Sequence, residues 1–158
     1  LQVDFAQKVQ AVTDLRGGEL TADELWGVFE EHYLAVTGPY ELGAVSQSGD
    51  RLTAEVAVDG VAQTVEGAGN GPIAALVDAF AHSFGVEIRI RDYHEHAMSA
   101  DAQATAAAYI EAEVDGDPVW GVGLSPSIVS ASLRAVVNAV DRSLTARKAV
   151  EEAAMLFD

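Results

Sequence analysis

The hydrophobic and polar residues of the chain alternate over two separate stretches, as they do in β-strands with one buried face. The first stretch covers residues 52–58, and the second, residues 86–91, places valine and isoleucine between charged residues. The pair Asp59-Gly60 follows the first stretch and favours a tight hairpin turn, because glycine adopts a positive φ readily. The alternation therefore predicts antiparallel strands joined by hairpins.

The first hairpin has a second copy further along the chain. Glu55-Val-Ala-Val-Asp-Gly60 recurs as Glu111-Ala-Glu-Val-Asp-Gly116, and a helical pattern that begins at a proline follows each copy, at Pro72 and at Pro126. The repetition predicts a duplicated strand, strand, strand, helix unit over residues 39–146.

Each predicted helix of the repeat has one hydrophobic face. Gly85 ends the first helix, and Ser125-Pro126 is predicted to cap and start the second. The hydrophobic faces consist of Ile73, Leu76, Val77, Phe80 and Phe84 in the first helix, and of Val129, Leu133, Val136, Val137, Val140 and Leu144 in the second.

The middle strand of the second unit is ambiguous in its composition. Residues 101–108 are rich in alanine and would favour a helix by propensity alone. They lead, however, directly into the repeated hairpin that ends at Gly116. The correspondence with the first unit favours a strand, and a strand is our prediction.

Residues 1–38 read as a helical linker subdomain that is too small for a core of its own. Hydrophobic spacing predicts a helix from about Val3 to Thr13, the Gly17-Gly18 pair interrupts it, and Thr21-Ala-Asp-Glu24 is a capping box for a second helix. Gly38-Pro39 ends that helix. At the other end, residues 147–158 form an acidic C-terminal tail.

These elements predict an α+β fold in which two pseudo-symmetric βββα units form a helix-covered antiparallel sheet, preceded by short linker helices. The internal symmetry leaves sheet edges or faces that a second copy could complete. We therefore expect a homodimer.

Composition and charge exclude several classes of function. With 158 residues the chain fits roughly one domain, and its formal net charge of −16 disfavours binding to nucleic acid or to anionic membranes. No stretch is long and apolar enough to span a membrane, and no secretory leader is evident. The absence of cysteine excludes disulfides and thiolate metal sites, so a cytoplasmic location is our default. Because the chain begins at Leu1, within a helical pattern, we expect it to be a fragment of a longer protein.

The glycine-rich turn Gly67-Ala-Gly-Asn-Gly-Pro72 precedes the first predicted helix and is the main candidate for binding. It is neither a dinucleotide fingerprint nor a phosphate-binding loop, because its spacing is Gly-x-Gly-x-Gly and it lacks a lysine. One interpretation is purely structural, a tight connection between strand and helix. The other is that N–H groups at the helix start bind the carboxylate of a small zwitterion.

His94-Glu95-His96 suggests a metal site or a general base only superficially. In a strand the two histidines share a face, but no third ligand has suitable spacing, and zinc sites need three or four. We interpret the segment as a polar strand end, and His32 and His82 as structural. No nucleophile has a recognisable local frame, so no catalytic residue and no metal site are predicted.

Small side chains surround Tyr93 and Ile90 in the predicted second unit. They either allow close strand packing or leave an apolar cavity for an aliphatic group. Together with the glycine turn, such a cavity would hold a carboxylate beside an apolar wall. The small residues are Ala97, Ala100, Ala104 and Ala106.

Several segments resemble the carboxy-terminal part of 2-isopropylmalate synthase, the first committed enzyme of leucine synthesis, in its actinobacterial form. The likeness covers nearly the whole chain to about Arg147. The matching segments are Leu1–Gln10, Gly69-Asn-Gly-Pro-Ile73, Asp92-Tyr-His-Glu-His-Ala-Met-Ser99, Ala107-Ala-Tyr-Ile-Glu111 and Trp120–Arg134.

The resemblance implies a regulatory domain of two βββα units that dimerises and binds leucine for feedback inhibition. Between Ser99 and Tyr109 the sequence departs from the family's glycine-containing pattern. This departure affects the assignment of Ala104 and Ala106 to the leucine site. The leucine site implied by the matching motifs comprises Gly69, Asn70, Gly71, Ile73, Ala74, Ile90, Tyr93, Ala97, Ala104, Ala106, Leu124 and Pro126.

The resemblance also implies that catalysis belongs to another part of the parent chain. The family's barrel, with its divalent metal and its sites for acetyl-CoA and 2-oxoisovalerate, has no counterpart in these residues, so we expect no acyltransferase activity and no cofactor in this fragment. Three alternatives remain: an isoleucine-sensing domain of citramalate synthase, a dimerisation module without ligand, and a metal-dependent hydrolase using residues 94–96.

Overall fold

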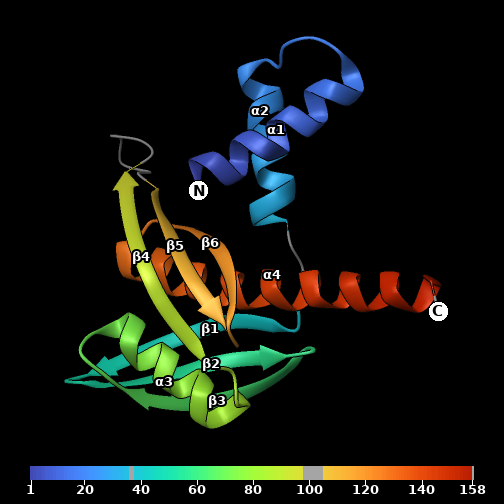
Figure 1. Ribbon diagram of the computed structural model, residues 1–158. Coiled ribbons are helices and arrows are strands. Elements are labelled where there is room, and N and C mark those ends of the chain that lie inside the picture. Colours follow the sequence, from blue (N-terminus) through green and yellow to red (C-terminus); the bar gives the residue numbers. More distant parts are fainter. Residues whose placement is uncertain (36–37, 98–104, 158) are drawn as a thin grey trace.

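The computed structural model describes residues 1–35, 38–97 and 105–157, which form a helical N-terminal region followed by two βββα units (Figure 1). This architecture confirms the α+β class and the duplicated unit. The strands form two separate three-stranded antiparallel sheets, each in sequence order. The first unit comprises β1 (Tyr40–Ser48), β2 (Arg51–Val58), β3 (Val61–Ala68) and α3 (Pro72–Phe84); the second comprises β4 (Ile88–Ala97), β5 (Ala106–Val114), β6 (Asp117–Ser125) and α4 (Ile128–Phe157).

Both predicted hairpins are confirmed by their backbone angles. Asp59 and Gly60 have φ values of 50° and 84°, and Asp115 and Gly116 have values of 48° and 90°. Positive φ at both central residues matches the right-handed twist of the flanking strands. The repeated Asp-Gly pair therefore fixes the register of β2 with β3 and of β5 with β6.

The alanine-rich middle strand of the second unit is also confirmed, with β5 beginning at Ala106. Residues 98–104 lie outside the described residues. The side chains of Ala106, Ala108 and Ile110 are buried in the core beneath α4. Pairing on both sides, with β4 and with β6, overrides the helical propensity of alanine.

Glycines on the last strand of each unit let the helix lie directly on the sheet. A Cβ atom added to Gly67 would lie 2.0 Å from the carbonyl oxygen of Ala75 in α3, and one added to Gly123 would lie 2.0 Å from that of Ala131 in α4. Such distances are far below van der Waals contact, so only glycine fits at these two positions.

The N-terminal region contains α1 (Gln2–Arg16), α2 (Ala22–Phe29) and the short π-helical turn η1 (Glu30–Leu34). The capping box is confirmed, since Thr21 Oγ1 accepts from the N–H of Glu24 while the Glu24 carboxylate accepts from the N–H of Thr21. Tyr33, which is fully buried, anchors this region to the second unit. Its hydroxyl donates to Asp4 of α1, and its carbonyl accepts from Asn138 Nδ2 of α4 at 2.7 Å.

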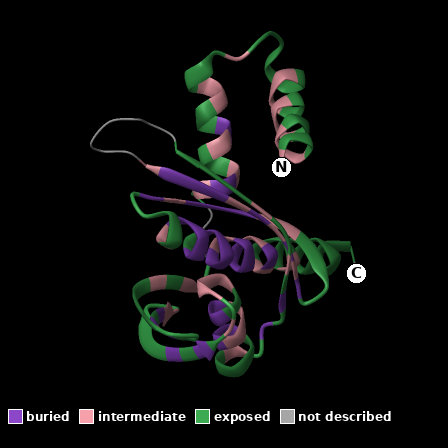
Figure 2. Ribbon diagram, turned by 90° about the vertical axis from the view of Figure 1, so that its left-hand side faces the viewer, coloured by how far each residue is buried: buried purple, intermediate pink, exposed green. Residues whose placement is uncertain are grey.

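Helix α4 starts later and extends further than the hydrophobic pattern indicated. It begins at Ile128 because Ser127, rather than Ser125, caps it, with Ser127 Oγ accepting from the N–H of Ser130 at 3.3 Å. At its other end the helix continues through residues 147–157, the predicted tail. Figure 2 shows burial concentrated in the two units, with the N-terminal helices mostly a mixture of intermediate and exposed residues and the far end of α4 exposed. Across the described ranges, no helix has both the length and the apolar character needed to cross a membrane.

Candidate functional site

The glycine turn between β3 and α3 is held by its own backbone. The N–H of Gly69 donates to Asp50 O at 2.9 Å, and the N–H of Gly71 donates to Gly69 O at 2.9 Å. Two of the predicted donors are therefore already used. A φ of 120° at Gly71 and the 2.8 Å that would separate a Cβ on Gly69 from Ala74 explain why both residues are glycine.

The helix start beside this turn retains donors that no side chain caps. Pro72, the first residue of α3, has no N–H, and no side-chain hydrogen bond caps the helix. The N–H groups of Ile73 and Ala74 belong to the first turn, where the helix dipole favours an anion. Of the residues predicted to hold a carboxylate, Ile73 and Ala74 at the helix start therefore keep uncapped N–H groups, whereas the N–H groups of Gly69 and Gly71 are used within the turn.

A second group of predicted residues shares the inner face of the sheet in the second unit, the face covered by α4. Ala97 pairs with Ala106, and Tyr93 pairs with Ile110, so their side chains lie on one face. The Tyr93 hydroxyl lies 2.8 Å from Ser132 Oγ of α4 and donates to the carboxylate of Glu95. Burial and the hydrogen bond to Glu95 raise the pKa of Tyr93 above its ordinary value.

The structure brings some predicted residues together and separates others. Ile73, Ile90 and Tyr93 pack against the same buried cluster. The turn, in contrast, belongs to the first unit, whereas β4 runs from α3 away from the first unit towards Ala97 (Figure 1). Pro126 is exposed just after β6. Ala104, with Ala100, lies outside the described residues.

Leu124 lies on the opposite face of the sheet from the other predicted residues of the second unit. It pairs with Ala107, whereas the adjacent Ser125 pairs with Ala106, so the side chain of Leu124 points away from α4. Period-two alternation distinguishes the two faces in the sequence, but it does not tell which face α4 covers.

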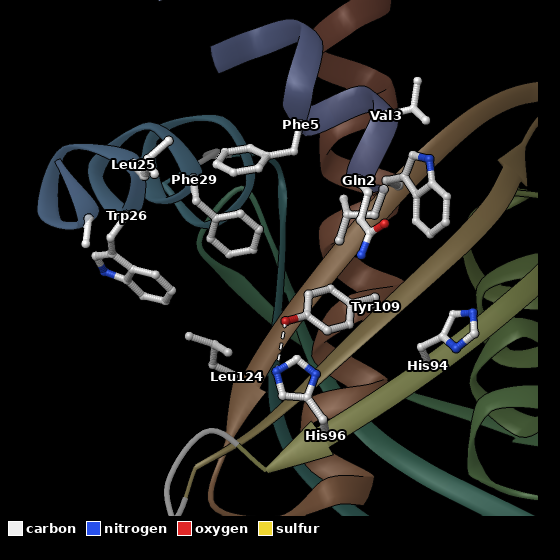
Figure 3. Close-up of a pocket in the computed structure, with 13 residues that line it drawn as sticks. Gln2, Val3, Phe5, Leu25, Trp26, Phe29, His94, His96, Tyr109 and Leu124 are labelled. Atoms are coloured by element: carbon white, nitrogen blue, oxygen red, sulfur yellow. Dashed lines mark hydrogen bonds between the residues drawn. The ribbon is translucent and has the colours of Figure 1, made fainter. Parts of the chain in front are cut away.

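Leu124 instead lines a groove of about 940 Å³ between the outer face of this sheet and the N-terminal helices, which we call the outer groove (Figure 3). Both tryptophans of the chain, Trp26 and Trp120, line it. No local pattern in the sequence reveals this surface, because its residues come from elements far apart in the chain. Its lining is Leu1, Gln2, Val3, Phe5, Ala22, Leu25, Trp26, Phe29, His94, His96, Tyr109, Trp120 and Leu124.

The histidines at residues 94–96 are partnered on this outer face. His96 stacks on Tyr109 with ring centroids 5.2 Å apart, and its Nε2 lies 3.3 Å from the Tyr109 hydroxyl. His94 Nε2 lies 3.0 Å from Asp92 Oδ2, while Glu95 lies on the opposite face. Within the residues that the structure describes, no group of three or more His, Cys, Asp or Glu side chains could hold a metal ion.

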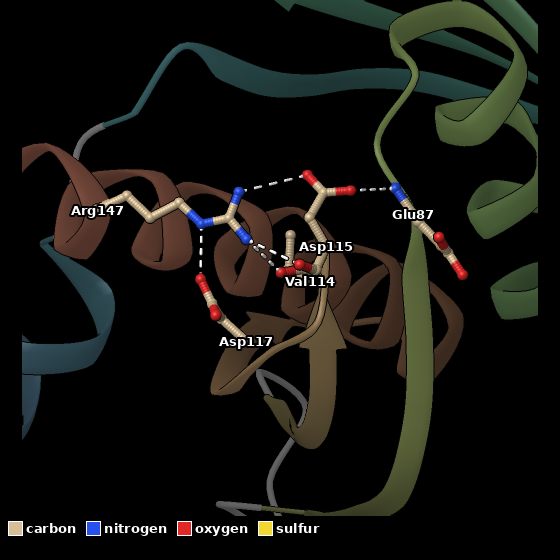
Figure 4. A network of polar contacts seen from close by, with 5 residues as sticks. All are labelled: Glu87, Val114, Asp115, Asp117 and Arg147. Atoms are coloured by element: carbon tan, nitrogen blue, oxygen red, sulfur yellow. Dashed lines mark hydrogen bonds and ion pairs between the residues drawn. The ribbon is translucent and has the colours of Figure 1, made fainter.

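Two charged side chains of α4 hold this helix against the rest of the chain. Asp141 is buried, accepts from the N–H of Tyr40 at 3.1 Å, and has its pKa raised to about 6 by burial, which the Tyr40 bond partly offsets. Arg147 Nε donates to Asp117 Oδ2 at 2.7 Å and its Nη2 to Val114 O at 2.9 Å. As Figure 4 shows, these bonds join α4 to the hairpin between β5 and β6.

Comparison with known proteins identifies a family whose match covers most of this fold. A model of the family described as the LeuA allosteric (dimerisation) domain matches residues 19–144, from just before α2 through most of α4. The chain belongs to this family. The match covers both βββα units and confirms the resemblance inferred from the sequence motifs.

The relatives are 2-isopropylmalate synthases, mostly from actinobacteria. The chain is 44% identical over 151 residues to the enzyme of Mycobacterium leprae, a match that covers 91% of the chain and 25% of the relative. It is 44% identical to the enzyme of Corynebacterium efficiens, with 91% of the chain and 26% of the relative covered. It is 43% identical to that of Cupriavidus taiwanensis, with 92% of the chain and 26% of the relative covered. The chain thus spans about a quarter of the length of these curated relatives and matches their regulatory domain.

Proposed function

We propose that this domain binds L-leucine, forms a homodimer, and transmits feedback inhibition to the catalytic part of a cytoplasmic 2-isopropylmalate synthase. The observation that carries the proposal is the match of residues 19–144 to an allosteric dimerisation domain, combined with relatives named for an enzyme of leucine synthesis. In this proposal residues 1–38 link the domain to the rest of the chain, residues 39–146 bind the effector, and residues 147–158 form a tail.

The chemistry of the two groups of residues suits an α-amino acid. The uncapped N–H groups of Ile73 and Ala74 would hold its carboxylate. The Glu95 carboxylate, held by the Tyr93 hydroxyl, offers a negative charge for its ammonium group. The small side chains of Ala97 and Ala106 would form the apolar wall beside a branched aliphatic group. Gly69, Asn70 and Gly71 would set the path of the turn.

Dimerisation would complete this site. Because the turn belongs to the first unit and Ala97 lies at the far end of β4, the two groups meet most simply across a two-fold interface, where one copy supplies the turn and its partner supplies the wall. Ile90 and Tyr93 would line the wall. Leu124, which faces the outer groove, and Pro126 would contribute only indirectly.

Feedback inhibition requires that leucine bind one state of the parent enzyme more tightly than another, with a coupling free energy of about 1–3 kcal/mol. The parent would be an acyltransferase that condenses acetyl-CoA with 2-oxoisovalerate in the portion of the relatives that this chain does not match. The buried Tyr33, bonded to both α1 and α4, provides a rigid connection from the second unit towards that portion.

Titration calorimetry of the domain with leucine, isoleucine and valine tests the proposal. We expect saturable heat with leucine at the lowest concentration. Tighter binding of isoleucine would favour the alternative of a citramalate synthase domain. If none of the three amino acids gives heat at millimolar concentration, and light scattering shows that the sample is dimeric, leucine binding is contradicted. The domain is then a dimerisation module without ligand.

A further inference from the structure

The outer groove is an apolar surface with aromatic walls that the described residues leave open. One side of the groove is the outer face of β4, β5 and β6, and the other side is formed by α1 and α2 (Figure 3). Leu25 and Phe29 of α2 line it together with Leu124 and Trp120 of the sheet. Trp26 is 39% exposed, a large fraction for an aromatic side chain of this size. A groove of this kind is suited to an amphipathic helix.

The last three turns of α4 present a complementary surface. Beyond Arg147 the helix leaves the sheets, and Val150 and Phe157 are 70% and 90% exposed. Residues spaced by four, three and four positions lie on one side of a helix, so Ala146, Val150, Ala153 and Phe157 form an apolar stripe. The opposite side carries Lys148, Glu151, Glu152 and Met155.

These two surfaces cannot meet within one copy. Helix α4 is continuous from Ile128 to Phe157 and packs on the inner face of the β4–β6 sheet, whereas the groove lies on the outer face. Bonds from Arg147 to Val114 and Asp117 hold the helix in this direction, and Figure 1 shows its far end projecting away from the sheets.

We propose that the end of α4 in one copy, residues 146–157, docks along its apolar stripe in the outer groove of a second copy, and that the partner does the same in return. A two-fold exchange buries both surfaces of both copies and leaves Glu151 and Glu152 in solvent. Because the contact occurs twice, each half needs to bury only about 800 Å² in total to reach the roughly 1,600 Å² of a standard interface. Pairing of the two helix ends with each other would leave both grooves uncovered.

Cross-linking provides a direct test, since the chain contains no cysteine. Two single variants, Ala22→Cys in the groove and Ala153→Cys on the stripe, are mixed and oxidised. We expect a disulfide between the two different variants. Met155→Cys, on the opposite side of the same helix, is the matched control and should give at least several-fold less product with Ala22→Cys.

The two tryptophans give a second readout, because both line the groove. Their emission should shift to shorter wavelength as the protein is concentrated through its dimerisation range. Val150→Glu should abolish this shift, and Met155→Glu should preserve it.

This inference rests on the homodimer of the proposed function but not on leucine binding. Light scattering that finds only monomers would overturn both the homodimer and the exchange. A dimer that forms the Ala153→Cys disulfide only with itself, or that forms no disulfide with Ala22→Cys, overturns the exchange alone. The same holds if Val150→Glu leaves the fluorescence shift intact.

Discussion

The hydroxyl of Tyr93 lies 2.8 Å from Ser132 Oγ and so joins β4 to the first half of α4 across the inner face of the second unit. Ser132 Oγ also donates to Ile128 O at 2.9 Å, one turn earlier in the same helix. The Tyr93 hydroxyl donates to Glu95. The ring and the carboxylate are thus held in place where we expect leucine to bind.

Tyr93→Phe should weaken leucine binding more than it weakens the fold. Removing the hydroxyl takes away the hydrogen bond to Glu95 and the close polar contact with Ser132, and the lost bond costs about 0.5–1.5 kcal/mol of the free energy of unfolding. Glu95 then loses the group that orients it. Calorimetry and urea denaturation check both effects, with Tyr109→Phe on the outer face as the control that should retain leucine binding.

Ala97→Leu should abolish leucine binding, while His96→Leu at the adjacent position should leave it intact. Successive residues of β4 point to opposite faces of the sheet, so the larger side chain enters the proposed apolar site only from position 97. Titration calorimetry of the two variants decides the matter. Equal affinity of both variants for leucine would place the site elsewhere.

Gly123→Ala should destabilise the domain by about 1–3 kcal/mol, since the new Cβ would lie 2.0 Å from Ala131 O and force α4 off the sheet. Gly27→Ala in α2 is the matched control. A Cβ at Gly27 meets nothing within 4 Å, and alanine favours the helix by about 0.5–1 kcal/mol. Thermal unfolding should therefore shift the two variants in opposite directions.

Asp141 should make the domain less stable as pH rises from about 4 to 6. Burial raises the pKa of its folded-state carboxyl from 3.8 to about 6, so between these values the folded protein binds more protons than the unfolded chain. Unfolding then releases a proton, and the free energy of unfolding falls with pH. Above pH 6 the full effect is present.

Asp141→Asn removes this ionisation while its amide oxygen can still accept from the N–H of Tyr40. The variant should gain stability relative to the wild type as pH increases from 4 to 6, with a constant difference above that range. Urea midpoints at a series of pH values measure the difference. A difference that does not change with pH would show that Asp141 ionises normally in the folded protein.

Much of the fold was predictable because its signals are local. The Asp59-Gly60 and Asp115-Gly116 pairs have positive φ values that few other pairs adopt, and Thr21 with Glu24 caps α2 through atoms only three residues apart. The repeat also gave β5 correctly, although its alanines favour a helix. The start of α4 was less well determined, since Ser125 and Ser127 both resemble caps in the sequence.

The candidate site was predictable only in its chemistry. The sequence indicated that a ligand could approach the backbone closely at Gly69 and Gly71. The hydrogen bonds that occupy their N–H groups form only in the folded turn, with Asp50 O and Gly69 O as acceptors. The outer groove was not predictable, because Trp26 and Trp120 belong to elements that meet only after packing.

The sequence by itself determined the family, the two βββα units and their turns, because these depend on the spacing and conformational preferences of neighbouring residues. Only the tertiary structure decided that Tyr93 faces α4 while Leu124 faces the N-terminal helices, and that the end of α4 extends beyond the sheets. Alternation along a strand distinguishes two faces, but which face is covered depends on long-range burial. Close packing of α4 over Gly121 and Gly123 selects one of them.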